Sequence, residues 1–390
     1  MRLRVIVLVY AALFVSELSW SGVTPLIPSY IDEYGLTDFE GGMVLSVASL
    51  GILVISIPAG LVTKYISPRT LTLASMATIA LAGFGMAVAP NYAAIIAARL
   101  LFGIGFGTMY VAMTAWLADA AGKESARVLA LTTSIVGVAA TLSPAYAGWM
   151  AGRFDLAAPF VGLAAITTLL FVLLLFDRSG TGLTKEAGPP TRELLHAARS
   201  DPGLVAMLLL TIAAATVWMT ADLLVPLRLD DGGFDVTEIG IAFSISSVVF
   251  VLASAVTARN ADRWTKIPFA AWWTAGLAVV TAIPALFLGV PAVLVFLMAA
   301  SIATGVIVAL TYPFGLLAVR RGAVTVAVMS ALANIIWALA GMLGPTVGGG
   351  FAEWAGDQMA FAVLALAAAL VVVLLLKYCR PARSPMPEAP

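Results

Sequence analysis

Charged residues are scarce in this sequence, and their scarcity excludes most soluble folds. Asp, Glu, Lys and Arg together make up 11% of the 390 residues, whereas soluble domains carry about 25%. Hydrophobic residues make up 62%, and they come in runs close to or above the ~18 to 20 residues needed to cross a bilayer. The composition therefore predicts a helical membrane protein with many spans.

Cysteine and histidine occur once each, and this excludes several kinds of site. The single cysteine, Cys379, cannot form an intramolecular disulfide. The single histidine, His196, falls in a polar stretch, where a solvated side chain is more frequent than a ligand. The sequence also lacks the H-E-x-x-H, G-x-S-x-G and P-loop patterns. We therefore expect no metal site, no cofactor, no enzymatic activity and no direct use of ATP.

Twelve apolar segments follow one another along the chain, with boundaries defined to within a few residues. The first continues well past Arg2 and Arg4 without an A-x-A cleavage site, so we expect a spanning helix rather than a signal peptide. Several segments contain Gly and Pro, which membrane helices tolerate better than soluble ones. The segments cover residues 5–31, 41–63, 70–89, 92–116, 128–150, 158–176, 204–229, 238–258, 267–288, 292–317, 325–350 and 359–377.

The polar segments between these spans alternate in charge. Of the 21 Lys and Arg residues, 18 fall in segments 1–4, 64–69, 117–127, 177–203, 259–266, 318–324 and 377–390. The other segments carry acids, such as Asp32 and Glu33 after the first span and Asp230 and Asp231 after the seventh. The positive-inside rule therefore predicts that both termini lie in the cytoplasm, as an even number of spans requires. The basic residues form no further patch, so no nucleic-acid partner is expected.

One long polar stretch divides the spans six from six, and the two halves resemble each other. An offset of 198 residues aligns Pro28 with Pro226, and an offset of 201 aligns Pro144 with Pro345. Parallel repeats of this kind are a transporter architecture. We predict an N-terminal six-helix bundle over residues 1–176, a cytoplasmic linker over 177–203, a C-terminal six-helix bundle over 204–377 and a disordered cytoplasmic tail over 378–390.

Short glycine-rich patterns fall at equivalent places in this repeat. Span 4 contains R-x-x-x-G-x-G, span 11 contains G-P-x-x-G-G with an echo in span 5, and the loop after span 8 ends in D-R. Such glycines let helix backbones approach closely. The patterns comprise Arg99, Gly103 and Gly105 in span 4, Pro144 and Gly148 in span 5, Asp262 and Arg263 after span 8, and Gly344, Pro345, Gly348 and Gly349 in span 11. With the T-P-L-I-P run over residues 24–28, their placement resembles the major facilitator superfamily over essentially the whole chain.

The resemblance implies an all-α membrane protein, with twelve transmembrane helices in two six-helix pseudo-repeats around a central cavity. It also implies a secondary transporter that works by alternating access, and the chain looks most like the proton-coupled efflux antiporters. In this family spans 1, 4, 7 and 10 line the cavity, and an acid–arginine loop such as Asp262-Arg263 braces the cytoplasmic gate. The matching loop of the first half departs from the pattern, with Thr63 or Lys64 where the family has an acid.

Three charged residues lie well inside the predicted spans: Glu17 in span 1, Arg99 in span 4 and Asp222 in span 7. A charge in the bilayer costs about 2.5 to 3.5 kcal/mol on the insertion scale and is usually kept for function. A low-dielectric cavity favours the protonated form of a carboxyl, and a nearby arginine favours the charged form. We therefore expect the three residues to couple transport to protons. The alternative is a static set of charges that fixes helix packing.

Helical spacing from these charges predicts the other residues of the cavity. Most are aromatic or apolar, with few hydrogen-bonding groups, which suits a lipophilic molecule, neutral or cationic, better than a sugar. The predicted set is Tyr10, Trp20, Thr24, Phe106, Tyr110, Met113, Trp218, Thr304 and Thr311.

The sequence thus predicts a proton-coupled exporter of a small, largely apolar or cationic organic molecule. Span 5 has Ser143 and Ala147 where the family's antiporters have glycine, so import or uniport of a metabolite is the alternative. A non-transporting membrane sensor is a remote alternative, because no long soluble segment is available to relay a signal. We expect the substrate, protons and the lipid bilayer as partners, and a monomeric chain in the plasma or inner membrane.

Overall fold

The structure, a computed structural model, describes residues 3–62, 65–121, 125–177, 201–287 and 289–379. These residues form α-helices and one short 3-10 helix, with no strand among them. Most of the predicted linker and tail, together with His196, Thr63 and Lys64, lies outside the described residues. The elements are α1 (Leu3–Ser21), η1 (Thr24–Leu26), α2 (Ile27–Tyr34), α3 (Asp38–Val62), α4 (Pro68–Ala87), α5 (Tyr92–Ala121), α6 (Ser125–Arg153), α7 (Ala158–Leu175), α9 (Pro202–Asp231), α10 (Val236–Arg259), α11 (Ala261–Trp264), α12 (Ile267–Leu286), α13 (Val290–Arg320), α14 (Val326–Ala355) and α15 (Asp357–Tyr378).

Eleven helical stretches within the described residues are long and apolar enough to cross a membrane. The remaining predicted span corresponds to α6, which is 29 residues long and carries Pro144 in its interior. Helix α6 packs against α1 and α5 of its own half and against α10 of the other. The helices are therefore consistent with the twelve spans that the sequence predicts.

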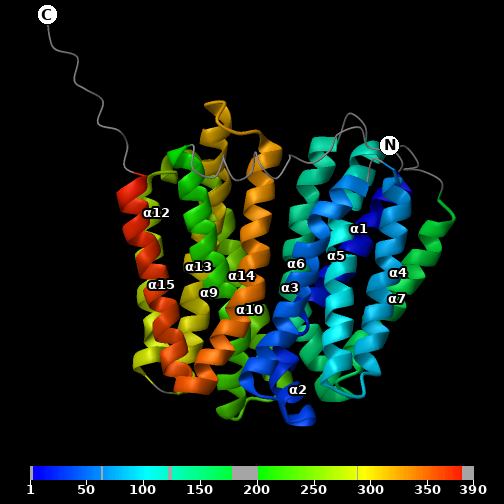
Figure 1. The fold of residues 1–390 in the computed structure, drawn as a ribbon, viewed down its shortest axis with the longest axis horizontal. Helices are drawn as coiled ribbons and strands as arrows, with labels where there is room; N and C mark the ends of the chain where they lie inside the picture. Colours follow the sequence, from blue (N-terminus) through cyan, green and yellow to red (C-terminus); the bar gives the residue numbers. More distant parts are fainter. Residues whose placement is uncertain (1–2, 63–64, 122–124, 178–200, 288, 380–390) are drawn as a thin grey trace, which may run out of the picture.

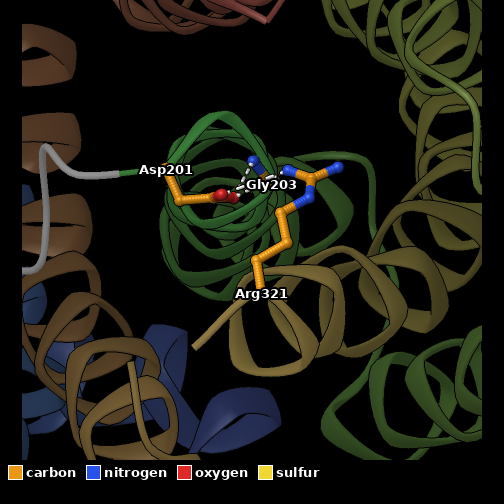
Figure 2. Close-up of polar contacts among 3 residues, drawn as sticks. All are labelled: Asp201, Gly203 and Arg321. Atoms are coloured by element: carbon orange, nitrogen blue, oxygen red, sulfur yellow. Dashed lines mark hydrogen bonds and ion pairs between the residues drawn. The ribbon is translucent and has the colours of Figure 1, made fainter. Parts of the chain in front are cut away.

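Polar residues and prolines fix where several of these helices begin. Asp201 precedes Pro202 at the start of α9, and its carboxylate accepts a hydrogen bond of 2.7 Å from the backbone N–H of Gly203. Arg321, directly after α13, forms an ion pair of 3.1 Å with the same carboxylate, as Figure 2 shows. An acid at a helix start satisfies N–H groups that have no partner within the helix. The same acid here also joins the start of α9 to the end of α13.

The first predicted span, 5–31, is not one continuous helix. It is divided into α1, η1 and α2, with the break directly after Ser21. Pro25 and Pro28 lack the backbone N–H that a continuous helix would use at their positions. The N–H of Leu26 instead donates to the Val23 carbonyl at 3.0 Å. Glu17 therefore lies about one turn before the break.

Figure 1 shows the helices in two groups side by side, α1 to α7 and α9 to α15, which we name the N-terminal and C-terminal bundles. Helix α1 begins and helix α15 ends at the same end of the molecule, which we name the terminal end. Helix α2 lies at the opposite end, which we name the distal end. The residue boundaries of the two bundles that the sequence suggests stay a prediction.

The first contact between the bundles joins α3 to α14. A Cβ atom on Gly42 would collide with the Pro345 carbonyl, and one on Gly349 would collide with the Asp38 carbonyl. Thr346 donates a hydrogen bond of 2.7 Å across this contact to Ser46. Because α3 begins at the distal end and α14 ends there, this contact closes the distal end.

The second contact joins α6 to α10 in the same way. A Cβ on Gly148 would collide with the Val236 carbonyl, and one on Gly240 with the Pro144 carbonyl. The backbone N–H of Ala145 donates to Ser244 Oγ at 3.0 Å. Two pairs of helices thus bring their backbones together at glycines, and we call these contacts the glycine seams.

Candidate functional site

Glu17 lies in the interior of the N-terminal bundle and has a partner on another helix. Its side chain is 5% exposed, and the Tyr110 hydroxyl of α5 donates a hydrogen bond to its Oε1. A hydrogen bond to an ionised acceptor is about twice as strong as a neutral one. The position of α5 relative to α1 therefore decides whether Glu17 keeps this donor.

A series of aromatic rings continues from Tyr110 along α5. Phe106 lies 5.1 Å from Tyr110 and 5.5 Å from Phe102, measured between ring centroids. Trp20 of α1 stacks on Phe106 at 5.3 Å and on Phe102 at 6.3 Å. These distances lie in the range of favourable aromatic pairs. We call Trp20, Phe102, Phe106 and Tyr110 the aromatic ladder.

Arg99 lies at the other end of this ladder from Glu17. The arginine is 2% exposed, its Nε donates to the Val44 carbonyl of α3 at 3.1 Å, and its guanidinium sits 5.3 Å from the Phe102 ring centre. Carbonyl and ring face are both suitable neutral partners for a buried cation. Among the described residues no ion pair joins Arg99 to Glu17. The aromatic ladder lies between the two groups.

Asp222 occupies a comparable place in the C-terminal bundle, in the middle of α9. Its side chain is half-buried and hydrogen-bonds with Trp218, one turn earlier on the same helix. Trp218 meets Phe250 of α10 edge-on at 4.5 Å and Trp337 of α14 at 6.3 Å. Each bundle therefore holds one carboxyl beside a group of aromatic rings.

The other predicted cavity residues divide by what their polar groups do. The Tyr10 hydroxyl donates to the Val128 carbonyl of α6 at 2.5 Å. Thr304 and Thr311 each donate to a carbonyl of their own helix, at Ala300 and Val308. Met113 and Thr24 are buried, Thr24 within η1. None of these groups forms a charged contact, so the charges of this region are those of Glu17, Arg99 and Asp222.

The predicted glycine and proline motifs lie at helix contacts. A Cβ on Gly103 would collide with the Ala48 backbone of α3, and one on Gly105 would lie 2.9 Å from Ile79 of α4. Gly344 and Gly348 face Thr220 of α9. Pro144, Gly148, Pro345 and Gly349 lie in the glycine seams. Asp262 and Arg263 lie exposed in α11, and no ion pair involves either of them within the described part of the chain.

Sequence reasoning missed three polar contacts and the rings Phe102, Phe250 and Trp337. Ser143 donates a 2.5 Å hydrogen bond to the backbone carbonyl of Leu18, the residue that follows Glu17 in the sequence. Its replacement of a motif glycine was the signal that could have marked it. The Ser46–Thr346 and Ala145–Ser244 contacts and the rings Phe250 and Trp337 carry no such signal, because only packing brings them together.

The chemistry of these side chains fits ligand binding rather than a metal. No group of three or more His, Cys, Asp or Glu residues in the described ranges could hold a metal ion. The buried Glu17 carboxyl, the half-buried Asp222 carboxyl, the buried Arg99 guanidinium and two sets of aromatic rings can bind or release protons and contact an apolar or cationic molecule.

A family profile described as the Major Facilitator Superfamily matches residues 9–345, and a second match covers 207–389. The chain belongs to the major facilitator superfamily. The family and the fold class that the sequence predicts are thereby confirmed. A member of this superfamily is a multi-pass membrane transporter rather than an enzyme.

Sequence relatives are distant and match only part of the chain. The quinolone resistance protein NorA of Staphylococcus aureus (strain MRSA252) is 22% identical over 169 residues, which is 43% of this chain and 43% of that protein. The multidrug resistance protein MdtL of Shewanella sp. (strain ANA-3) is 23% identical over 231 residues, 58% of each chain. Each match therefore spans about half of the relative's length.

Solved structures match over nearly the full chain. A bacterial homologue of the human lysosomal transporter Spinster, inward-facing and unoccupied, has a TM-score of 0.81 at 13% identity, covering 98% of this chain and 99% of the other. The nucleoside transporter NupG has a TM-score of 0.76 at 15% identity, covering 96% of this chain and 100% of the other. At such identities the likeness concerns the fold alone.

Proposed function

We propose that this transporter exports a small, largely apolar or cationic organic molecule in exchange for protons, by alternating access. The observation that carries the proposal is the Glu17–Tyr110 hydrogen bond, which holds a buried carboxyl of α1 against the aromatic ladder of α5. A buried carboxyl is costly in the membrane, so its retention at this place supports a functional role. Asp222 and Arg99 complete the proposed coupling group.

The aromatic side chains support the proposed substrate class. Tyr110 contacts Glu17 and is followed along the ladder by Phe106 and Trp20, and Trp218 contacts Asp222. Ring faces attract cations, and flat apolar molecules stack on them. The names of the distant relatives NorA and MdtL, which refer to quinolone and multidrug resistance, point in the same direction.

We base the coupling cycle on the alternation of Glu17 between a protonated and an ionised state. A protonated Glu17 is neutral and leaves the ladder free of charge, whereas an ionised Glu17 attracts a cation to the same rings. A proton and a cationic substrate would then exclude each other from the site, which is the condition for exchange. The glycine seams join the bundles at the distal end, so the cycle would proceed by separating them.

We also propose the orientation of the chain. Arg4 near the start of α1 and Lys377 near the end of α15 lie at the terminal end, and Asp32 of α2 lies at the distal end. The positive-inside rule then puts the terminal end in the cytoplasm of a plasma or inner membrane. On this orientation the distal end faces the outside.

The test is proton movement in proteoliposomes that contain a pH-sensitive dye. With a proton gradient imposed, adding a lipophilic cation such as a fluorescent dye should produce a substrate-dependent change of internal pH. The Glu17→Gln variant should remove this change while the protein still reconstitutes. Unchanged proton-driven transport by Glu17→Gln would contradict the coupling role.

One observation favours import or uniport as a second candidate. Ser143 replaces a glycine of the antiporter motif, and its hydroxyl fastens α6 to the Leu18 carbonyl of α1. The same assay separates the two: an importer or uniporter accumulates or equilibrates substrate in liposomes whose orientation is known, with no proton counterflow.

A further inference from the structure

Arg228 stands at the distal end of α9 and holds two acids of its own bundle. Its Nε is ion-paired with Asp357 of α15, and its Nη1 lies 3.2 Å from Asp231 on the same helix. The arginine side chain is 32% exposed, whereas that of Asp357 is 10% exposed. Arg228 and these acids line a pocket whose walls include Phe287 and Phe361. The pair is therefore shielded from solvent on one side.

The N-terminal bundle brings a further acid to this place. Asp38 is the first residue of α3, and its carbonyl touches the backbone of Gly349 in the glycine seam. Its carboxyl is within electrostatic range of Asp231, Glu353 and Arg228. Asp357 of α15 is within electrostatic range of Asp38 as well. Three acids, one each from α9, α14 and α15, and the arginine of α9 therefore surround the Asp38 carboxyl.

The carboxylates of Asp38 and of the C-terminal bundle's acids repel each other. They come together only when the two bundles are closed at the distal end. Asp230 of α9 is also within electrostatic range of Asp32 of α2, an acid of the other bundle. Juxtaposed like charges oppose association. Arg228 is a cation within electrostatic range of Asp38, whereas Arg153 at the end of α6 lies over the ring of Phe154.

We propose that Arg228 controls the distal gate, by compensating the repulsion between Asp38 of the N-terminal bundle and the acids of the C-terminal bundle when the gate closes. The arginine then does more than join α9 to α15 within one bundle. Its charge sets the balance between the closed and open distal end. This role does not depend on the substrate, on the direction of transport or on protons.

The experiment measures the distance between two spin labels across the distal end. Cys379 is buried, and burial raises the pKa of its thiol to about 11, so the thiol is almost entirely protonated and slow to react at neutral pH. Replacing it by serine leaves a chain without cysteine. Labels at the exposed positions Asn91 and Leu286 report the distal end, and labels at Tyr65 and Lys266 report the terminal end.

The Arg228→Gln variant should raise the ratio of open to closed distal ends by about five- to tenfold at low salt, the size expected for a partly exposed charge. High salt should reverse most of this change, because the Debye length falls from about 10 Å at 0.1 M to about 3 Å at 1 M. Arg153→Gln removes an equal charge from the same end and should leave the distances unchanged.

Asp38→Asn decides between a gate and a purely local ion pair. In the Arg228→Gln background it should restore closure, because the repelling acid of the opposite bundle is gone. Alone, it should favour closure slightly, since three acids and one arginine face it. If Asp357→Asn restores closure and Asp38→Asn does not, Arg228 acts only within its own bundle and the proposal is wrong. Opening of the distal end by Asp38→Asn alone would equally overturn it.

Discussion

The carboxyls Glu17 and Asp222 differ in where their hydrogen-bond donors come from. The internal repeat aligns Trp20 with Trp218 at an offset of 198. In the N-terminal bundle the acid stands three residues before this tryptophan, and in the C-terminal bundle four residues after it. Relative to the equivalent tryptophans, the acid lies earlier in the sequence in one bundle and later in the other. The two acids are therefore placed asymmetrically along the membrane normal.

This difference indicates which carboxyl changes its hydrogen bonding when one helix moves against another. Glu17 takes its donor, Tyr110, from a different helix. Asp222 takes its donor, Trp218, from its own helix, where four residues of spacing keep the two together. A shift of α5 against α1 changes the surroundings of Glu17, whereas no shift between helices separates Asp222 from Trp218. The N-terminal carboxyl is therefore the better placed of the two to link protonation with conformation.

The largest expected effect compares the two acids directly. Glu17→Gln should lower substrate-dependent proton flux by about a hundredfold, the lower range for removing a positioned proton-transferring group. Asp222→Asn should lower it less, because the hydrogen-bond donor of Asp222 is on its own helix. Dye-loaded proteoliposomes with equal amounts of each variant measure both. Equal losses would remove the functional distinction between the bundles.

A second comparison concerns glycines in the fourth span of each bundle. A Cβ on Gly103 meets three backbone atoms of Ala48, whereas one on Gly305 meets a single backbone atom, the Phe250 carbonyl, at 2.6 Å. Gly103→Ala should therefore destabilise the protein by about 2 kcal/mol, and Gly305→Ala by less. Gly276→Ala is the matched control, because nothing lies within 4 Å of its added Cβ. Thermal unfolding in detergent ranks the three, and a Gly305→Ala that is the least stable would reverse the comparison.

The smallest effect is expected from substitutions that remove the hydrogen-bond donors of Glu17 and Asp222 and leave both carboxyls in place. Tyr110→Phe should reduce proton-coupled transport about tenfold, since a hydrogen bond to a charged group contributes about 1.5 kcal/mol. Trp218→Phe keeps the ring contacts with Phe250 and should reduce transport less. Transport rates normalised to reconstituted protein measure the difference. A larger loss in Trp218→Phe would assign the coupling role to the C-terminal bundle.

Spans, repeat and family were predictable because the bilayer imposes them. Any chain that crosses it needs long apolar runs, so these are visible in the sequence alone. The division of the first span was not predictable in the same way. Pro144 and Pro226 lie inside the continuous helices α6 and α9, whereas Pro25 and Pro28 accompany a break. Which proline interrupts a membrane helix depends on the neighbours that satisfy the backbone.

The candidate site was predictable in its charges but not in its pairings. The sequence placed Glu17 and Arg99 inside spans 1 and 4 and suggested that a nearby arginine would affect the carboxyl. In the structure Glu17 accepts a hydrogen bond from Tyr110, and Arg99 donates one to the Val44 carbonyl. Helix rotation and local packing decide which partner each side chain reaches. Val44 belongs to a helix that no sequence pattern had linked to Arg99. A backbone carbonyl is available at every residue, so sequence cannot single one out.

The break in the first span has a mechanical consequence. Helix α1 packs within the N-terminal bundle, whereas η1 also touches α9 and α10 of the other bundle. Any relative rotation of the bundles must therefore bend this span. A bend in an intact helix has to stretch backbone hydrogen bonds, each contributing about 1 kcal/mol, but at Pro25 and Pro28 the donors are already missing. The elastic work of bending is lowest where the span contacts both bundles, about two turns after Glu17.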